Sequence, residues 1–260
     1  MLPRATRRYS ISHPRHGDDM EPNQERVEAV AKAIYSFALD RARKSVDSLE
    51  YNSDKIPSIF RSLKSESQIA QILVFSSFLE DCVRTLIKAR FKHLDTKNVE
   101  AKVFGGNGPL GTFSNRLLIA FQLGWLTSNT MGKLSAFKNL RNEFAHHAFE
   151  RKITDQHIKD HIKSLSIDAQ SRIDRCREAF EADTLPPKIS SYGDLRDDEQ
   201  LLMQFLFLYD QTVRDLLVLP NAILHHVSPF DIVGDFDTGS TMLKSHQLAI
   251  SQAFLELVIV

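Results

Sequence analysis

Apolar residues recur three and four positions apart along most of the chain, which is the spacing of one face of an α-helix. The pattern is clearest from residue 23 to about 48, from about 65 to 92 and from 199 to 219. Shorter segments with the same spacing cover about 114–126, 128–147, 154–165, 168–182 and 241–260. No segment alternates with the period of two that a strand requires. The sequence therefore predicts an all-α fold.

Interruptions of this pattern divide the chain into four parts. Residues 1–22 hold several arginines and prolines but almost no aliphatic side chains, so we expect a disordered basic arm. Residues 23–182 predict a helical bundle of five or six helices, with a break at Pro57. Residues 183–198, with two adjacent prolines, predict a linker, and residues 199–260 predict a helical C-terminal extension.

A glycine-rich stretch at residues 104–113 separates two of the predicted helices. Its sequence, FGGNGPLGTF, holds too much glycine for the interior of a helix or strand. A phosphate-binding P-loop would need a preceding strand and a lysine at fixed spacing, and neither is present. We therefore expect a tight structural loop, followed by a helix that Ser114 caps.

The charge balance limits the partners of the protein. Lysine plus arginine and aspartate plus glutamate number 33 each, so no overall field attracts nucleic acid or an anionic membrane. We expect only weak, non-specific nucleic-acid binding through the arm at Arg4 to Arg15. No apolar stretch approaches the ~20 residues that span a bilayer, so we expect no membrane contact and a cytoplasmic location. Cys82 and Cys176 lie in amphipathic segments, which is typical of reduced, packed thiols.

Two charged residues interrupt apolar stripes. Glu80 lies between Ser76 and Val83 on the helix at 65–92, and Arg141 lies among the apolar residues of the helix that Thr127 or Ser128 can cap. A buried carboxylate and a buried guanidinium each need a partner. The sequence therefore predicts that Glu80 and Arg141 form a buried ion pair between two helices.

The middle of the chain resembles the mannitol operon repressor family of bacterial regulators. The resemblance rests on "SSFLEDCVRTLI", then "FGGNGPLGTFSNRLLIAFQLGWL", then "LSAFKNLRNEFAHH", and it spans about residues 65–180. The residues that carry it after the glycine loop are Phe113, Ser114, Arg116, Ala120, Leu123 and Gly124, and then Arg141, Asn142, Phe144, Ala145 and His146. The arm and the residues after about 185 lie outside it.

This resemblance implies an all-helical regulatory domain that acts on transcription. The sequence itself contains no helix-turn-helix with a basic second helix, no paired zinc-ligand spacing and no basic heptad region. We therefore expect regulation through a protein partner or an effector, with a homodimer as a further expectation. A purely structural interaction domain stays open as a third interpretation.

A second, less specific resemblance involves Arg141, Asn142 and His146. Their spacing is similar to the Arg-x4-6-His motif of HEPN domains, several of which are metal-independent ribonucleases. The resemblance implies that Arg141 stabilises the scissile phosphate of RNA, His146 moves the proton of the 2′-hydroxyl and Asn142 orients the phosphate. Glu80 would be the polar residue of the preceding long helix. Five residues along a helix rotate by roughly 140°, so Arg141 and His146 diverge unless the helix frays near His147.

The two resemblances lead to two hypotheses. The first is a transcriptional regulator that is not an enzyme and acts by protein or effector contact. The alternative is a HEPN-like endoribonuclease of a toxin or phage-defence system, with Arg141 and His146 as its catalytic pair. Neither hypothesis includes a cofactor or a metal, because the chain offers no complete set of metal ligands.

Overall fold

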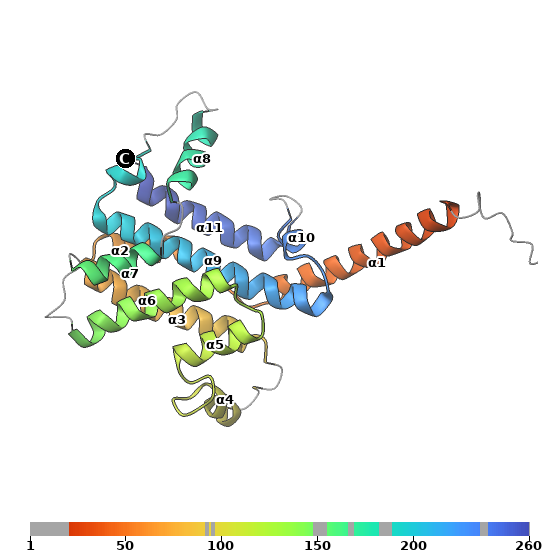
Figure 1. Cartoon of the computed structure of the whole chain (residues 1–260), viewed down its shortest axis with the longest axis horizontal. Helices are drawn as coiled ribbons and strands as arrows, with labels where there is room; N and C mark the ends of the chain where they lie inside the picture. The colour runs from red at the N-terminus through yellow and green to blue at the C-terminus, as the bar shows by residue number, and fades with distance from the viewer. Residues whose placement is uncertain are drawn as a thin grey trace, which may run out of the picture.

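The computed structural model describes residues 21–91, 94, 97–147, 155–165, 169–181, 189–234 and 239–259. Helices α1 to α11 and one 3-10 turn make up this part of the chain, which contains no strand beyond an isolated bridge between Ile189 and Ile259. The all-α prediction is confirmed (Figure 1). The predicted arm at 1–22 lies outside the described residues except for Glu21 and Pro22, which begin α1.

The first two helices differ in how far they are buried. The predicted helix at 23–48 is α1, Glu21–Asp47, and every residue from 24 to 37 is exposed. Pro57 does not break the chain but lies in the first turn of α2, Ile56–Lys64, which was not predicted. Its missing N–H costs nothing there, because first-turn amides have no partner within a helix.

Helices α3 to α6 carry the segment that the sequence analysis singled out. The helix expected at 65–92 is α3, Gln68–Lys88, and it is followed by α4, Lys97–Phe104, α5, Phe113–Gln122, and α6, Ser128–His147. As predicted, Thr127 caps α6, because its hydroxyl accepts the N–H of Thr130 at 3.2 Å. α4 was not predicted, and its only buried residue is Phe104, so it offers no apolar periodicity.

Four of the remaining helices were predicted, whereas a 3-10 turn and one short helix were not. They are α7, Gln156–Ser164, α8, Ala169–Glu181, the 3-10 turn η1, Tyr192–Asp194, α9, Asp197–His225, α10, Pro229–Val233, and α11, Thr241–Val258. Residues 154 and 168, where two of these helices were expected to begin, lie outside the described residues.

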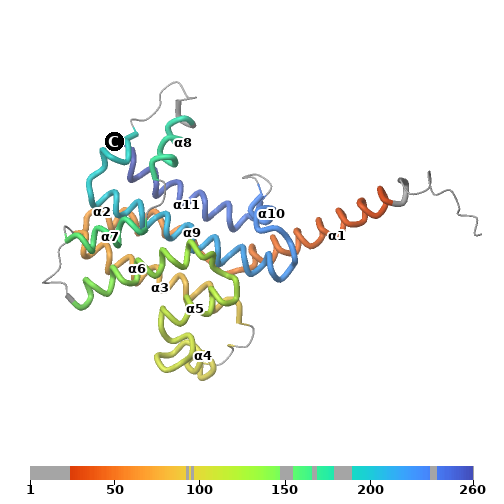
Figure 2. The backbone as a smooth tube through the Cα atoms, in the orientation of Figure 1, coloured from red at the N-terminus to blue at the C-terminus, as the bar shows by residue number. Residues whose placement is uncertain are grey.

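α9 lies at the centre of the helical body. Every residue from 201 to 210 is buried, so this helix has no solvent face along that length. It packs against α1, α2, α3, α6, α10 and α11, and Figure 2 shows it passing between α11 on one side and α3 and α6 on the other. The sequence analysis had assigned this helix to a C-terminal extension. Neither it nor any other described helix is both long and apolar enough to cross a membrane.

Aromatic rings from three helices meet at the core. The rings of Phe75 on α3 and Phe205 on α9 stack with their centroids 4.5 Å apart and an interplanar angle of 3°. Phe137 on α6 places its ring edge-on to both, at 5.3 Å from each. Such contacts add directional preference to burial, so they set how α3, α6 and α9 face one another.

α9 continues through Pro220 without ending. Proline has no N–H to donate to the carbonyl of Leu216, four residues earlier. Arg90, which follows α3, fills this gap, because its Nη2 donates to the carbonyl oxygen of Leu216 at 2.8 Å and to that of Leu217 at 3.2 Å. Its Nη1 also donates to the side-chain oxygen of Asn221 at 3.3 Å. Burial lowers the pKa of the Arg90 guanidinium to about 10, so the group stays charged at neutral pH.

We expect Arg90→Met to destabilise the protein by about 1–3 kcal/mol, because it strands a buried carbonyl acceptor. The loss should be smaller in a Pro220→Ala background, where the alanine N–H can supply the helical hydrogen bond. A double-mutant cycle measured by urea unfolding tests this coupling. Equal losses in both backgrounds would show that Arg90 does not compensate for the proline.

Candidate functional site

The glycine loop between α4 and α5 is a tight turn in which Gly105, Gly108 and Gly111 face backbone atoms. A Cβ atom on Gly105 would lie 2.3 Å from the carbonyl oxygen of Ala101, and one on Gly111 would lie 2.1 Å from that of Gly105. These distances leave no room for a side chain. The loop therefore needs glycine for close packing.

The buried side chain of Arg116 on α5 hydrogen-bonds to the backbone of this loop. Its side chain is only 3% exposed, and its Nη1 donates to the carbonyl oxygens of Leu110 and Gly111 at 3.2 and 3.4 Å. Its Nη2 donates to the carboxylate of Glu80 on α3. The predicted pairing of Glu80 with Arg141 is therefore wrong. Glu80 did need a cationic partner, but α5, and not α6, brings that cation to α3.

The neighbouring residues of α5 have structural positions. Thr112, and not Ser114, caps the helix, because its hydroxyl accepts the N–H of Asn115 at 3.1 Å. Ser114 is exposed, whereas Phe113 is half-buried and packs against the core. The predicted cap at Ser114 is therefore wrong by two residues.

The Arg141 to His146 segment lies in the last turns of α6. Arg141 and Asn142 are half-buried, and the Nη1 of Arg141 donates to the side-chain oxygen of Asn142 at 3.2 Å. His146 is exposed. α6 remains helical through His147, so Arg141 and His146 keep the roughly 140° divergence of an unbroken helix. Within one chain, the helix does not bring the two side chains of the HEPN-like motif onto one face.

A buried aspartate–histidine pair lies elsewhere, between α9 and α11. Asp210 is 8% exposed and His246 is 1% exposed, and the Oδ1 of Asp210 lies 3.2 Å from the Nε2 of His246. Arg172 on α8 donates from Nη1 to the other carboxylate oxygen at 3.5 Å. Burial alone would raise the pKa of Asp210. The hydrogen bond from His246 and the charges of His246, Arg214 and Arg172 outweigh burial and hold that pKa below its usual value.

Polar side chains extend from this pair into the core. The hydroxyl of Tyr51 lies 3.5 Å from the Nδ1 of His246 and also contacts the hydroxyl of Tyr209. The thiol of Cys82 on α3 donates to the Tyr209 hydroxyl at 3.8 Å. Burial raises the pKa of Cys82 to about 12, and it also raises the pKa of both tyrosines. These three groups are therefore neutral, and Asp210 with its partners carries the charge.

The side of Asp210 away from the core opens into two adjoining hollows of about 1120 and 630 Å³, a size typical of small-molecule pockets. Arg172, Asp210 and Arg214 line both of them. Lys133 on α6 lines the larger and Arg175 on α8 lines the smaller. We call the surface formed by Lys133, Arg172, Arg175 and Arg214 the cationic groove.

Cations exceed free carboxylates in the cationic groove. Arg214 forms no hydrogen bond or ion pair with another residue that the structure describes. Partial burial lowers the pKa of Lys133, and the charge of Arg172 lowers it further, which shows that like charges gather here. Asp215, the second acid of the larger hollow, accepts the N–H and hydroxyl of Thr127 at 2.9 and 3.0 Å. These neutral donors leave the charge of Asp215 in place, so the larger hollow holds three cations and two carboxylates.

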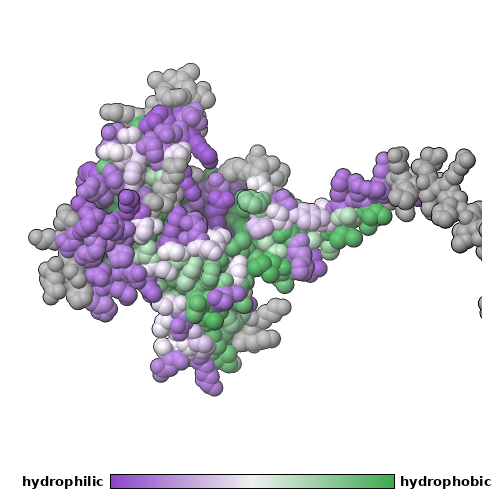
Figure 3. Space-filling view, viewed as in Figure 1, coloured by the Kyte–Doolittle hydropathy of each residue, from purple (hydrophilic) through white to green (hydrophobic). Residues whose placement is uncertain are grey.

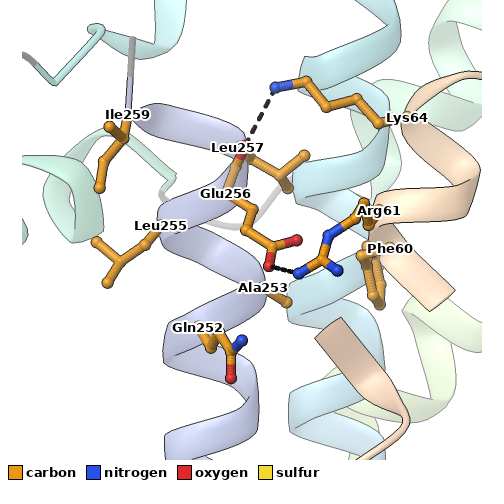
Figure 4. Close-up of a pocket in the computed structure, with 9 residues that line it drawn as sticks. All are labelled: Phe60, Arg61, Lys64, Gln252, Ala253, Leu255, Glu256, Leu257 and Ile259. Carbon is orange, nitrogen blue, oxygen red and sulfur yellow. Dashed lines mark hydrogen bonds and ion pairs between the residues drawn. The ribbon is translucent and has the colours of Figure 1, made fainter. Parts of the chain in front are cut away.

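A third hollow, between α2 and α11, has a different character (Figure 4). Its volume is about 470 Å³, and its two cations, Arg61 and Lys64, are both engaged by Glu256. Arg61 pairs with the carboxylate, and the Nζ of Lys64 donates to the backbone oxygen of Glu256 at 3.1 Å. Lys64 also forms an ion pair with Glu199 at 3.3 Å. No charge is left over for a ligand, so this hollow is a helix interface rather than a candidate site.

A comparison with protein families matches residues 56–223, more than half of the chain, to the model described as "Mannitol repressor". The chain belongs to the mannitol repressor family. The match extends beyond the expected limit near residue 185 and includes nearly all of α9. No curated protein and no solved structure matches the chain. Membership in a family named for a repressor indicates a role in transcriptional regulation.

The mannitol repressor match covers all four residues of the cationic groove but not the histidine of the buried pair. Lys133, Arg172, Arg175, Asp210 and Arg214 fall inside residues 56–223, whereas His246 on α11 lies outside. The sequence analysis named none of these residues. One signal was present, since Asp210 is an acidic residue within the long apolar segment at 199–219. Among the described residues, no cluster of three or more histidine, cysteine or acidic side chains could hold a metal ion.

We expect Asp210→Asn to destabilise the protein at pH 7 by about 1–3 kcal/mol. Because the pKa of Asp210 is lowered by folding, its charge stabilises the fold above the ordinary aspartate pKa of about 3.9. This contribution is lost as the pH falls through the lower, folded value. In urea unfolding, the free energy of unfolding of the wild type should exceed that of the variant at neutral pH, and this gap should narrow below about pH 4. A gap that stays constant between neutral and acid pH would contradict the assignment.

Proposed function

We propose that the protein is a transcriptional regulator whose state is set by an anionic small molecule bound in the cationic groove. The observation that carries this proposal is the excess of cations over carboxylates around this concave surface. The larger hollow has three cations and two carboxylates, and the smaller has three cations and one carboxylate. Arginine pairs with phosphate or carboxylate through two parallel hydrogen bonds. The expected ligand class is therefore a phosphorylated or carboxylated metabolite.

The attraction would be local to the groove. The chain has 33 basic and 33 acidic residues, so its overall charge does not favour anions. Charges within a partly enclosed hollow are less screened than charges on an open surface, and they act over short distances. A small ligand that enters the hollow would benefit from them, whereas long duplex DNA would not.

Asp210 couples the cationic groove to the core, because it contacts residues on both sides. Arg172 contacts the carboxylate of Asp210 from the groove side, and His246 contacts it from α11. An anion that draws Arg172 or Arg214 toward itself would weaken their attraction for Asp210. This loss of positive charge near Asp210 would alter its interaction with His246, and with it the packing of α11 on α9. This coupling supports an effector-controlled switch.

We further propose that the regulator acts on transcription through a protein partner. The chain carries no recognised DNA-reading motif, and its net charge of zero offers no broad basic surface. The endoribonuclease alternative stays a prediction. No contact in the structure favours it, because α6 continues unbroken past His146.

Thermal unfolding with inorganic phosphate and pyrophosphate tests the effector site. Phosphate stabilises most proteins by exclusion from their surface, so the informative quantity is the difference between variants. We expect the ligands to raise the unfolding temperature of wild type more than that of Arg214→Met. Bound ligand adds RT ln(1 + [L]/Kd) to the free energy of unfolding only where a site exists. Lys159→Met, which removes an exposed charge on α7, is the matched control and should respond like wild type.

The two possible outcomes can be distinguished when all measurements are made at the same ionic strength. A shift that is reduced by Arg214→Met but retained in Lys159→Met supports the cationic groove. Equal shifts in wild type and both variants would mean surface exclusion alone, and would overturn the proposal.

A further inference from the structure

The first part of α1 projects from the helical body into solvent (Figure 1). Every residue from 24 to 37 is exposed, including four large apolar side chains. These are Val27, Val30, Ile34 and Phe37, and between 58% and 65% of each is exposed. Figure 3 shows the apolar surface running along one edge of the projecting helix. We call these four residues the α1 stripe.

Two physical arguments indicate that the α1 stripe is covered in solution. The projecting part of α1 would by itself be only marginally stable in water, since the stability of a helix in a protein normally comes from burial of an apolar face. A contiguous exposed apolar patch is also the usual mark of an interaction site. The spacing of three, four and three residues is that of the a and d positions of a heptad, which favours another helix as the partner.

We infer that two copies of this chain form a homodimer by antiparallel packing of their α1 stripes. About a two-fold axis near residue 32, Val27 faces Phe37 of the second copy and Val30 faces Ile34. Both layers then repeat by symmetry, so the same patch serves both copies, as a closed two-fold dimer requires. Each layer joins a larger side chain to a smaller one.

The charges beside the stripe specify the antiparallel direction. Arg26 and Asp40 occupy equivalent flanking positions two heptads apart, and neither pairs with another described residue. In the antiparallel arrangement, Arg26 of each copy faces Asp40 of the other, which gives two opposite-charge pairs. A parallel arrangement would place these residues beside Ala31 or other uncharged positions and leave them unpaired.

The remaining neighbours of the stripe fit close helix packing. Ala31, Ala33 and Ala38 occupy the other flanking positions, and their small side chains allow two helices to approach. Lys32 lies on the opposite side of the helix, where it would stay in solvent. Antiparallel packing also places the two helical bodies at opposite ends of the paired helices, so they do not collide.

The root of the projecting helix is held in a fixed direction. The hydroxyl of Tyr35 donates to the carboxylate of Asp231 and accepts the N–H of Ser228 at 2.9 Å. Arg43 donates to the backbone oxygen of Asp231 at 2.6 Å. These bonds fix α1 to α10, so the stripe is presented rigidly and loses less conformational entropy on association.

Sedimentation of the full chain across a range of concentrations tests the inference. We expect wild type to dimerise. Arg26→Asp and Asp40→Arg should each raise the dimer Kd by about tenfold, because each replaces two attractive pairs with two repulsive ones. The double variant Arg26→Asp/Asp40→Arg should restore the wild-type Kd. Lys32→Asp, a charge reversal on the outer side of the same helix, is the matched control and should change little.

Three results would overturn the inference. Wild type that stays monomeric at every concentration would show that something else covers the stripe. A dimer that survives Ile34→Glu would form through another surface. Single variants that weaken the dimer without rescue by the double variant would contradict the antiparallel arrangement. Circular dichroism of each variant shows whether the helical body is intact, since all the altered residues are exposed in the single chain.

Discussion

The structure depends on the burial of α9, which has no solvent face from residue 201 to 210 and stays largely buried as far as Ala222. A helix without a solvent face cannot leave its polar groups to water, so each of them needs a partner from a neighbouring helix. At Pro220 this partner is Arg90 after α3, and at Asp210 the partners are His246 on α11 and Arg172 on α8. The same contacts that satisfy α9 therefore determine where these helices lie around it.

The candidate function follows from the unequal surroundings of Asp210. Toward the core, the neighbouring Tyr51, Tyr209 and Cys82 are neutral because burial raises the pKa of each. Toward solvent, Arg172 and Arg214 bring more positive charge than one carboxylate balances. A buried pair and an anion-attracting groove thus share the same residues. The proposed effector response does not require a separate mobile element, because any change of charge in the groove acts directly on Asp210 and His246.

The helical pattern could be predicted well from the sequence, and the contacts between helices could not. Periodicity located α1, α3 and α9. It missed α2, which is apolar at helical spacing, because Pro57 in its first turn was interpreted as a break, and it missed α4, which has one buried residue. The same analysis recognised that Glu80 needed a cation. It paired Glu80 with Arg141 and did not consider Arg116, because spacing along one helix does not determine which neighbour packs against it. α9 was interpreted as an extension for a similar reason, since a continuous apolar segment does not reveal how many helices will cover it.

The site was harder to predict than the fold. Lys133, Arg172, Arg214 and His246 come from α6, α8, α9 and α11, and nothing in their local sequence indicates that they converge. The motif at Arg141 to His146 attracted attention because its residues are close in sequence, but an unbroken helix turns them apart. Closeness along the chain was therefore a poor guide to closeness in space.

The central claim is that the cationic groove and the Asp210–His246 pair act as one unit. Hydrogen exchange with and without inorganic phosphate, at matched ionic strength, tests it most directly. The claim predicts that phosphate changes amide protection in α8, α9 and α11 of the wild type, that α5 is unaffected, and that the effect is lost in Arg214→Met. Protection that changes equally in all helices, or only outside α9 and α11, would contradict it.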